Sequence, residues 1–265
     1  MGFRRMRRLA RKTPEHLRSP PLSLDNPCLK GPLKYGSSKR QTWDNVSWKY
    51  DLQRRDDVIY HACADFVTEL TSSENAEGTV LDAGCGTGWT SIPLAETFQT
   101  VLAVDFSFKS LKILQGKVGK RNVFPVAADL TCLPFADSCF DAVQCANVLQ
   151  HLAPPHHDVA VSELQRVARR GARICFSVHH YSRLKRNAGW PKEEEPVQSG
   201  IDYIYRFSRT DLARLAKWKN IRGIGFGLPR IPIIRLILEK FIAKRLGTIA
   251  ARIGSGHMLV AWMKK

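Results

Sequence analysis

The sequence predicts an α/β protein with a doubly wound, mostly parallel sheet and helices on both faces. Two observations carry this prediction. Strand-like apolar runs alternate with helical patterns between residues 79 and 179, and acidic residues end the first three of these runs. Helices join neighbouring strands in such sheets, and ligands bind beyond the carboxyl ends of the strands. A chain of 265 residues is long enough for one such domain.

The first expected strand ends in the segment Val80–Gly88, with the sequence V-L-D-A-G-C-G-T-G. Three glycines stand there at alternate positions, Gly84, Gly86 and Gly88. Glycine is favoured where a turn needs unusual backbone angles and where a ligand comes close to the main chain. A helix expected over residues 89–98 would then present its N-terminal N–H groups to the ligand. The segment therefore predicts a nucleotide-like ligand.

Four more strands follow at regular spacing. They end on or near polar residues: Asp105, Asp129, Asn147 and His179. Since the carboxyl ends of parallel strands share one edge of the sheet, one cleft can collect these side chains together with Asp82. Two final strands are expected at the C-terminal end of the chain, I-R-G-I-G-F and H-M-L-V-A-W-M.

The connecting helices show apolar residues at helical spacing. One precedes the glycine-rich strand over residues 58–70 and is expected to pack over the ligand-facing edge of that strand. Ser107 can cap the helix that follows the second strand. After a loop at Pro154 and Pro155, a further helix is expected over residues 157–170, with Gly171 as its C-cap.

Segments outside this core differ in composition. Residues 1–40 are predicted to be a basic, flexible segment, and residues 41–265 the folded domain. Residues 181–207 break the alternation with aromatic, charged and turn-forming residues, which predicts a lid or a wall for a second ligand. Residues 229–247 have the pattern of a basic amphipathic helix, which either packs on the domain or lies on a membrane surface.

The formal charge of +17 is concentrated in the flanks, with +9 in residues 1–40, +12 in residues 203–265 and −4 between them. Such flanks favour an anionic membrane surface or RNA as partner, or serve solubility alone. The seven cysteines contain no C-x-x-C pair, which argues against a disulfide framework. No zinc or other metal site is expected, although His151, His156 and His157 lie close together.

The motifs taken together resemble the class I S-adenosylmethionine-dependent methyltransferases, and within them the type 11 group that includes enzymes of ubiquinone and menaquinone biosynthesis. The resemblance covers residues 43–180, and more weakly the last strands. It rests on V-L-D-A-G-C-G-T-G, V-D-F-S, A-A-D-L-T-C-L-P-F-A-D-S-C-F-D and N-V-L-Q-H-L. It implies a Rossmann-like, seven-stranded sheet. A dinucleotide dehydrogenase is disfavoured because the third glycine comes one residue earlier than in G-x-G-x-x-G.

The resemblance also implies S-adenosyl-L-methionine as the cofactor and a set of residues that bind it. The glycine turn would hold the methionine part, Asp105 the two ribose hydroxyls, and Asp129 with Leu130 the adenine. Asn147 would touch the methionine end, and the Y-D-x-x-R pattern at Tyr50 and Arg54 would close over the cofactor. The full predicted set is Tyr50, Arg54, Asp82, Gly84, Cys85, Gly86, Gly88, Asp105, Phe106, Asp129, Leu130 and Asn147.

Methyl transfer by in-line displacement requires mainly alignment of the acceptor and exclusion of water, and a base only if the acceptor must lose a proton. His151 and His179 are the candidate catalytic bases, and a structural role for each is the alternative.

We expect a small-molecule or lipid-like acceptor. An RNA (tRNA or rRNA) methyltransferase that uses the basic flanks and a non-catalytic, cofactor-binding partner subunit are the alternatives. A cytoplasmic location is expected, either free or peripheral at a membrane. If the source is eukaryotic and the Arg-rich N-terminus is a transit peptide, the location is mitochondrial.

Overall fold

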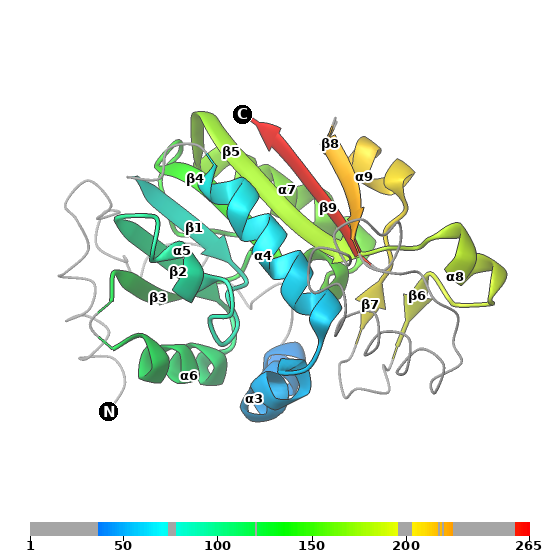
Figure 1. Cartoon of the computed structure of the whole chain (residues 1–265), viewed down its shortest axis with the longest axis horizontal. Helices are drawn as coiled ribbons and strands as arrows, with labels where there is room; N and C mark the ends of the chain where they lie inside the picture. Colours follow the sequence, from blue (N-terminus) through cyan, green and yellow to red (C-terminus); the bar gives the residue numbers. More distant parts are fainter. Residues whose placement is uncertain are drawn as a thin grey trace.

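The computed structural model describes residues 37–73, 78–119, 121–195, 203–216, 218, 220–224 and 258–265. Seven strands form one sheet in the order β3-β2-β1-β4-β5-β9-β8 (Figure 1). Their bounds are β1 Thr79–Ala83, β2 Thr100–Asp105, β3 Val123–Ala127, β4 Phe140–Ala146, β5 Ala168–His179, β8 Asn220–Ile224 and β9 Met258–Lys264. The predicted seven-stranded α/β fold is confirmed.

The direction of the strands explains where a ligand can bind. The pairs β3–β2, β2–β1, β1–β4 and β4–β5 are parallel, whereas β9 runs antiparallel to both β5 and β8. From β1 the chain proceeds outward to β2 and β3, and it then returns to the other side of β1 as β4. This reversal of strand order creates a crevice between the carboxyl ends of β1 and β4, where doubly wound sheets bind their ligands.

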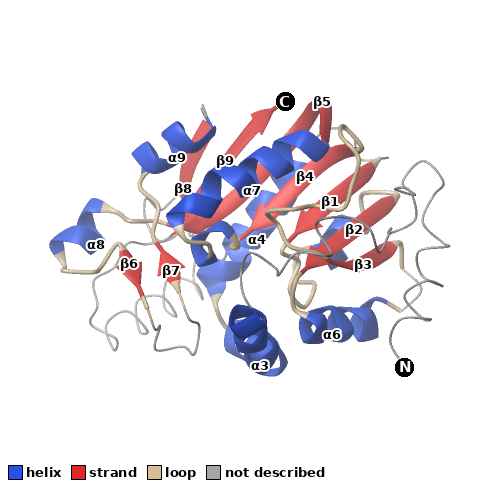
Figure 2. Cartoon of the chain, turned by 180° about the vertical axis from the view of Figure 1, so that it is seen from behind, coloured by secondary structure: helices blue, strands red, loops and turns tan. Residues whose placement is uncertain are grey.

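Helices cover both faces of the sheet, as Figures 1 and 2 show from opposite sides. On one face lie α4, α5 and α6, which pack against strand residues such as Val80, Val101 and Cys175. On the other face α7 and α9 pack against Leu81, Val143 and the other strand residues whose side chains point to that face. The bounds are α4 Val58–Ser72, α5 Ser91–Leu94, α6 Phe108–Val118, α7 Pro154–Val167 and α9 Arg209–Ala216.

Elements that do not belong to this core surround the crevice. Helix α3, Ser37–Arg54, lies beside α6, and the one-turn 3-10 helix η2, Leu149–His151, follows β4. The short helix α8, Arg183–Asn187, and the two-stranded ladder of β6, Glu193–Glu194, and β7, Ile204–Tyr205, belong to the predicted insertion. No helix in the described ranges is long and apolar enough to cross a membrane.

Several predicted boundaries are wrong for identifiable reasons. The helix expected over 89–98 is only one turn, α5, followed by turns. Helix α7 begins at Pro154, because proline suits the first helical turn, where an N–H has no partner inside the helix. It ends at Val167, since Ala168 already pairs with Phe140 in the sheet, and Gly171 therefore lies in β5 and caps no helix.

The prediction for helix α4 is also corrected. Most of it packs across β4, β5 and β9, and only its first turn reaches the ligand-facing edge, where Tyr60 lines the pocket beside residues of α3. Helix α3 begins at Ser37, inside the segment predicted to be flexible, while residues 1–36 and the predicted helix over 229–247 lie outside the described residues.

The cysteines follow the prediction with one exception. Cys63, Cys85, Cys139, Cys145 and Cys175 are free thiols, whereas Cys132 is disulfide-bonded. The sequence-based argument against disulfides is therefore wrong at Cys132.

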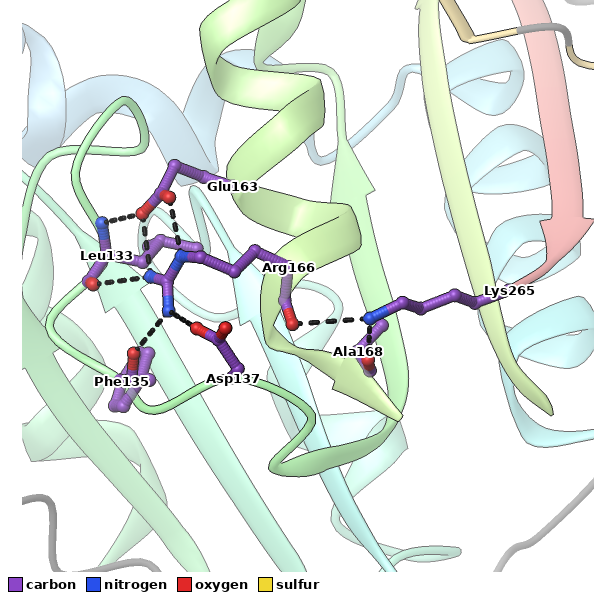
Figure 3. A network of polar contacts seen from close by, with 7 residues as sticks. All are labelled: Leu133, Phe135, Asp137, Glu163, Arg166, Ala168 and Lys265. Carbon is purple, nitrogen blue, oxygen red and sulfur yellow. Dashed lines mark hydrogen bonds and ion pairs between the residues drawn. The ribbon is translucent and has the colours of Figure 1, made fainter. Parts of the chain in front are cut away.

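A polar network fixes the loop between β3 and β4 (Figure 3). The Arg166 guanidinium of α7 donates to both carboxylate oxygens of Glu163, at 2.7 and 2.8 Å, and to Asp137 at 2.8 Å. It also donates to the carbonyl oxygens of Leu133 and Phe135. Because this loop also contains Asp129 and Leu130, the network helps to hold one wall of the crevice in place.

Candidate active site

A pocket of about 1040 Å³, including its open mouth, lies at the carboxyl ends of β1, β2 and β4. Its lining comes from the strand ends, from the loops that follow them and from the start of α4. Helix α3 completes the wall with Trp43, Ser47 and Tyr50.

The glycine turn forms the floor of the pocket, and its three glycines serve different purposes. All three have positive φ, at 78° for Gly84, 52° for Gly86 and 94° for Gly88. A Cβ on Gly84 would lie 2.2 Å from Val148 Cγ2, and one on Gly88 would lie 2.3 Å from Leu114 Cδ1. A Cβ on Gly86 would meet no protein atom within 4 Å. Gly84 and Gly88 are therefore needed for packing, whereas Gly86 leaves the pocket open for a ligand.

This difference gives a prediction for alanine variants. Gly86→Ala should lower the free energy of unfolding by only about 1 kcal/mol, the cost of a side chain at positive φ, and should weaken S-adenosylhomocysteine binding at least tenfold. Gly84→Ala should destabilise the fold by more than Gly86→Ala, because Val148 must move. Urea unfolding and titration calorimetry measure the two effects. Equal ligand affinity in Gly86→Ala and the wild type would contradict this role for Gly86.

Asp105, at the end of β2, reaches the pocket beside the glycine turn. Its Oδ2 accepts a hydrogen bond from the Gly86 N–H at 2.9 Å, and its Oδ1 accepts from the Ser107 N–H at 2.8 Å. Burial raises the pKa of Asp105 to about 6, with a smaller contribution from the charge of Asp82. A carboxylate oxygen can accept more than one hydrogen bond, so Asp105 keeps capacity for ligand hydroxyls.

Asp82 lies beneath the turn and does not line the pocket. Its side chain is fully buried, and Oδ2 accepts from the hydroxyls of Thr90 at 2.9 Å and Ser91 at 2.6 Å. Oδ1 has no hydrogen-bond partner among the described residues. Burial raises the pKa of Asp82 to about 6. The predicted ligand contact is not seen, and Asp82 instead ties the turn to the start of α5.

The raised pKa predicts how Asp82→Asn changes stability. A carboxyl group whose folded-state pKa is raised destabilises the fold when it ionises, so the cost is fully present above about pH 6 and is lost as the pH falls toward the unfolded value of 3.8. Asp82→Asn should therefore be more stable than the wild type by about 3 kcal/mol at pH 7.5. Urea unfolding as a function of pH measures this, and a difference that stays constant between pH 7.5 and 4.5 would contradict the assignment.

Asn147 and Asp129 stand on opposite sides of the pocket lining. Asn147 has φ of 60°, which asparagine tolerates better than most residues, and its N–H donates to the Ser177 carbonyl at 3.0 Å. Its Nδ2 is buried and has no hydrogen-bond partner among the described residues. Asp129 accepts from the Thr131 N–H and hydroxyl, at 2.8 and 2.7 Å, and Leu130 lies next to it. Both residues line the pocket.

His151, at the end of η2, lines the pocket as a neutral imidazole. Its Nδ1 lies 3.1 Å from the Tyr203 carbonyl oxygen, and since a carbonyl can only accept, Nδ1 carries the proton and Nε2 the lone pair. Trp43 packs edge-on against the ring, with 4.7 Å between the centroids. Burial lowers the pKa of His151 to about 4.

Helix α3 contributes more to the site than the predicted Tyr50, because Trp43 and Ser47 also line the pocket and two carboxylates hold the helix in place. Asp44 accepts from the Ser107 hydroxyl at 2.6 Å and from the Lys109 N–H at 3.0 Å, which caps α6. Asp51 accepts from the Thr87 hydroxyl at 2.6 Å and from the Trp89 indole, and it pairs with Lys117 at 2.5 Å. These contacts hold α3 over the glycine turn.

The interactions of Asp51 also change its ionisation. Burial alone would raise the pKa of Asp51, but the bonds from Lys117 and Thr87 outweigh that effect and lower it. The carboxylate therefore stays ionised where it anchors α3.

The structure brings most of the predicted residues into one pocket. Those that line it are Tyr50, Gly84, Cys85, Gly86, Asp105, Phe106, Asp129, Leu130, Asn147 and His151. Arg54 does not line the pocket, because it pairs with Asp57 at 3.0 Å and lies over the ring of Tyr60 at 4.9 Å. His179 lies at the end of β5, one strand away from the crevice, and does not line the pocket either.

Lining residues that were not predicted include Tyr60, Thr87, Trp89, Thr90 and Ser110, besides Trp43 and Ser47. Among the described residues, no group of three or more His, Cys, Asp or Glu side chains is arranged to hold a metal ion.

Comparisons with known proteins agree with this geometry. Residues 81–176 match the family model of a methyltransferase domain. Demethylmenaquinone methyltransferase of Thermobifida fusca (strain YX) is 40% identical over 161 residues, which cover 56% of this chain and 65% of that enzyme. Malonyl-[acyl-carrier protein] O-methyltransferase of Herminiimonas arsenicoxydans is 38% identical over 98 residues, which cover 37% of this chain and 36% of that enzyme. The matches thus span less than two thirds of either relative.

A solved structure shares the fold at lower sequence identity. The 1,6-didemethyltoxoflavin-N1-methyltransferase of Burkholderia thailandensis, with bound 1,6-didemethyltoxoflavin and S-adenosylhomocysteine, superposes with a TM-score of 0.58 and 19% identity. The match covers 89% of this chain and 90% of that protein. The fold and the matched segment define a class I S-adenosylmethionine-dependent methyltransferase domain. The segment that matches the family model is a type 11 methyltransferase domain, and it contains the glycine turn, Asp105, Asp129 and Asn147.

Proposed function

We propose that the protein transfers a methyl group from S-adenosylmethionine to a small, lipid-like acceptor by in-line displacement. The observation that carries this proposal is the pocket itself, where Gly86, Asp105 and Asn147 line one cavity and the position above Gly86 holds no protein atom within 4 Å of where a Cβ would lie. A carboxylate in such a pocket has the acceptor capacity for ligand hydroxyls, and the bare main chain at Gly86 lets a ligand come close.

The residues of the pocket fit this cofactor. Gly86 leaves room for it against the main chain, and Asp105 has the acceptor capacity for two ribose hydroxyls. Asp129 and Leu130 offer a carboxylate and an apolar surface to the adenine, and Asn147 offers its amide to the methionine end. When bound, the cofactor supplies a methyl group on a positively charged sulfur.

On the acceptor side, His151 is the candidate base and α3 is the wall. The Nε2 lone pair of His151 can take a proton from an acceptor hydroxyl or acidic carbon as the new bond forms. Trp43 and Tyr50 supply flat apolar surfaces that exclude water and suit a ring-shaped acceptor.

The names of the relatives support a small acceptor of lipid character. One relative acts on demethylmenaquinone and another on a malonyl group carried by an acyl carrier protein. A quinone precursor agrees better with the aromatic wall of the pocket than a malonyl group, which has no ring. Neither the described residues nor these relatives favour the RNA alternative or the non-catalytic alternative.

The proposal is tested with a labelled methyl group. The protein is incubated with S-adenosylmethionine that carries a deuterated methyl group and with a cell extract split into lipid, small-molecule, protein and RNA fractions. Mass spectrometry is expected to find the label in the lipid or small-molecule fraction, and calorimetry should detect S-adenosylhomocysteine binding. Label found in RNA alone, or no label despite cofactor binding, would overturn the proposal.

A further inference from the structure

Helix α3 carries an exposed apolar pair that the fold does not use. Its outer face consists of Gln41, Asn45, Trp48 and Leu52, which are spaced along one side of the helix and are all exposed. Trp48 is 69% exposed and Leu52 is 58% exposed, the two highest values among the large hydrophobic side chains that the structure describes. Since these residues lie one turn apart, they form one apolar ridge.

The inner face of the same helix belongs to the pocket. Trp43, Ser47 and Tyr50 line it, and Val46 is 7% exposed. Burial of this inner face and the bonds of Asp44 and Asp51 account for the docking of α3 on the domain. Trp48 and Leu52 therefore have no evident role in holding the helix in place.

The charges around the ridge are basic. Helix α3 contains four Lys or Arg residues and α6 contains three, of which Arg54 pairs with Asp57 and Lys117 pairs with Asp51. The two acidic residues of α3 are turned toward α6 and the glycine turn, and α6 contains none. Exposed Lys109 and Lys112 lie on α6 beside α3, and Arg40 lies over the ring of Phe108 at 4.7 Å. Helices α3 and α6 are neighbours (Figure 1). Cations and apolar side chains of the two helices are therefore exposed close together.

We propose that the outer face of α3 docks on the surface of an anionic lipid bilayer, with Trp48 and Leu52 inserted among the headgroups. Tryptophan favours the membrane interface, and basic residues around an inserted apolar ridge are attracted to anionic lipid. Because the inner face of α3 lines the pocket, docking brings the pocket close to the bilayer, where lipid-like acceptors are dissolved. This inference goes beyond the proposed chemistry and does not depend on it.

The test is sedimentation of the full-length protein with vesicles, without cofactor or acceptor. The vesicles contain phosphatidylcholine alone or a mixture with phosphatidylglycerol. The wild type should bind the mixed vesicles and lose affinity when the anionic lipid is left out. The double variant Trp48→Ser, Leu52→Ser should bind the mixed vesicles at least about tenfold more weakly, given the apolar area lost.

A matched control separates this ridge from general hydrophobicity. Val159 is 41% exposed on α7, away from the pocket lining, and Val159→Ser should bind vesicles like the wild type. Unchanged affinity for S-adenosylhomocysteine would verify that the double variant is folded.

Equal vesicle binding by the wild type and the double variant would overturn the inference. So would light scattering that shows a wild-type dimer lost in the double variant without vesicle binding, or RNA binding that replaces vesicle binding. None of these outcomes bears on methyl transfer, which the deuterated label tests separately.

Discussion

His151→Gln is expected to lower kcat about 100-fold if the acceptor must lose a proton, which is the lower end of the effect of removing a positioned base. The low end applies because burial lowers the pKa of His151 to about 4, which makes its imidazole a weak base. Glutamine keeps a polar side chain of similar size but cannot take up the proton. Initial rates at saturating cofactor and acceptor measure the loss.

The pH profile separates a catalytic role from a structural one. Since the lowered pKa keeps His151 neutral down to about pH 4, the wild-type kcat at saturating cofactor should stay level from pH 8 to pH 5 and fall only near pH 4. Cofactor affinity should instead weaken below about pH 6, where Asp105 takes up a proton. The variant should lose the acidic limb of kcat as well as most of its rate. His179→Gln is the matched control, because His179 does not line the pocket, and its kcat should stay near that of the wild type. A larger loss in His179→Gln than in His151→Gln would reverse the assignment.

Asp105→Ala is expected to weaken S-adenosylhomocysteine binding about 100-fold or more. Two hydrogen bonds from ribose hydroxyls to a carboxylate account for this, each contributing about 1.5 kcal/mol or more. The variant also removes the acceptor for the Gly86 and Ser107 N–H groups, which loosens the turn. Titration calorimetry measures the affinity.

Two further variants show whether the effect is specific. Asp105→Asn keeps one acceptor oxygen and should fall between the alanine variant and the wild type. Asp141 is a comparable carboxylate near the opposite end of the strands, where it accepts from the Thr79 N–H at 2.7 Å and pairs with Arg169. Asp141→Asn should change stability and leave ligand affinity as it is. Unchanged affinity in Asp105→Ala would remove the ribose assignment.

The core of the fold could be predicted because its signals are local. Each central strand is an apolar run that ends close to a polar residue, so the ends at Asp105 and Asn147 were located correctly. Helix ends were harder to predict, because Gly171 suggests a C-cap and only its place in β5 shows that it is not one. Pairing across the sheet overrides this local preference.

The pocket wall could not be predicted because its contacts join distant segments. The bond from Ser107 to Asp44 joins residues 63 positions apart, and the bond from Thr87 to Asp51 joins residues 36 positions apart. Trp43 showed no pattern that separates a wall residue from ordinary packing. Arg54 matched a family motif, yet Asp57 is only three residues away and pairs with it.

The two candidate histidines show the same limit. Each lies at or just after the end of a strand in the sequence. Only the strand order shows that His151, which follows β4, lies next to β1, whereas His179 at the end of β5 lies one strand further from the crevice. For similar reasons the sequence located the insertion at residues 181–207 but did not reveal its contact with the site. The Tyr203 carbonyl fixes the tautomer of His151, and a main-chain carbonyl carries no signal in the sequence.

The position of α3 has a consequence for how such enzymes diverge. The matched family segment, residues 81–176, supplies the glycine turn, both aspartates and His151, whereas Trp43, Ser47 and Tyr50 come from a helix outside it. One wall of the pocket is thus encoded outside the matched segment, in a separate stretch of the gene. Recombination or point mutation within codons 37–54 can change this wall while the glycine turn and the strand-end aspartates stay intact. Relatives that share the matched segment can therefore differ in the shape and chemistry of this wall.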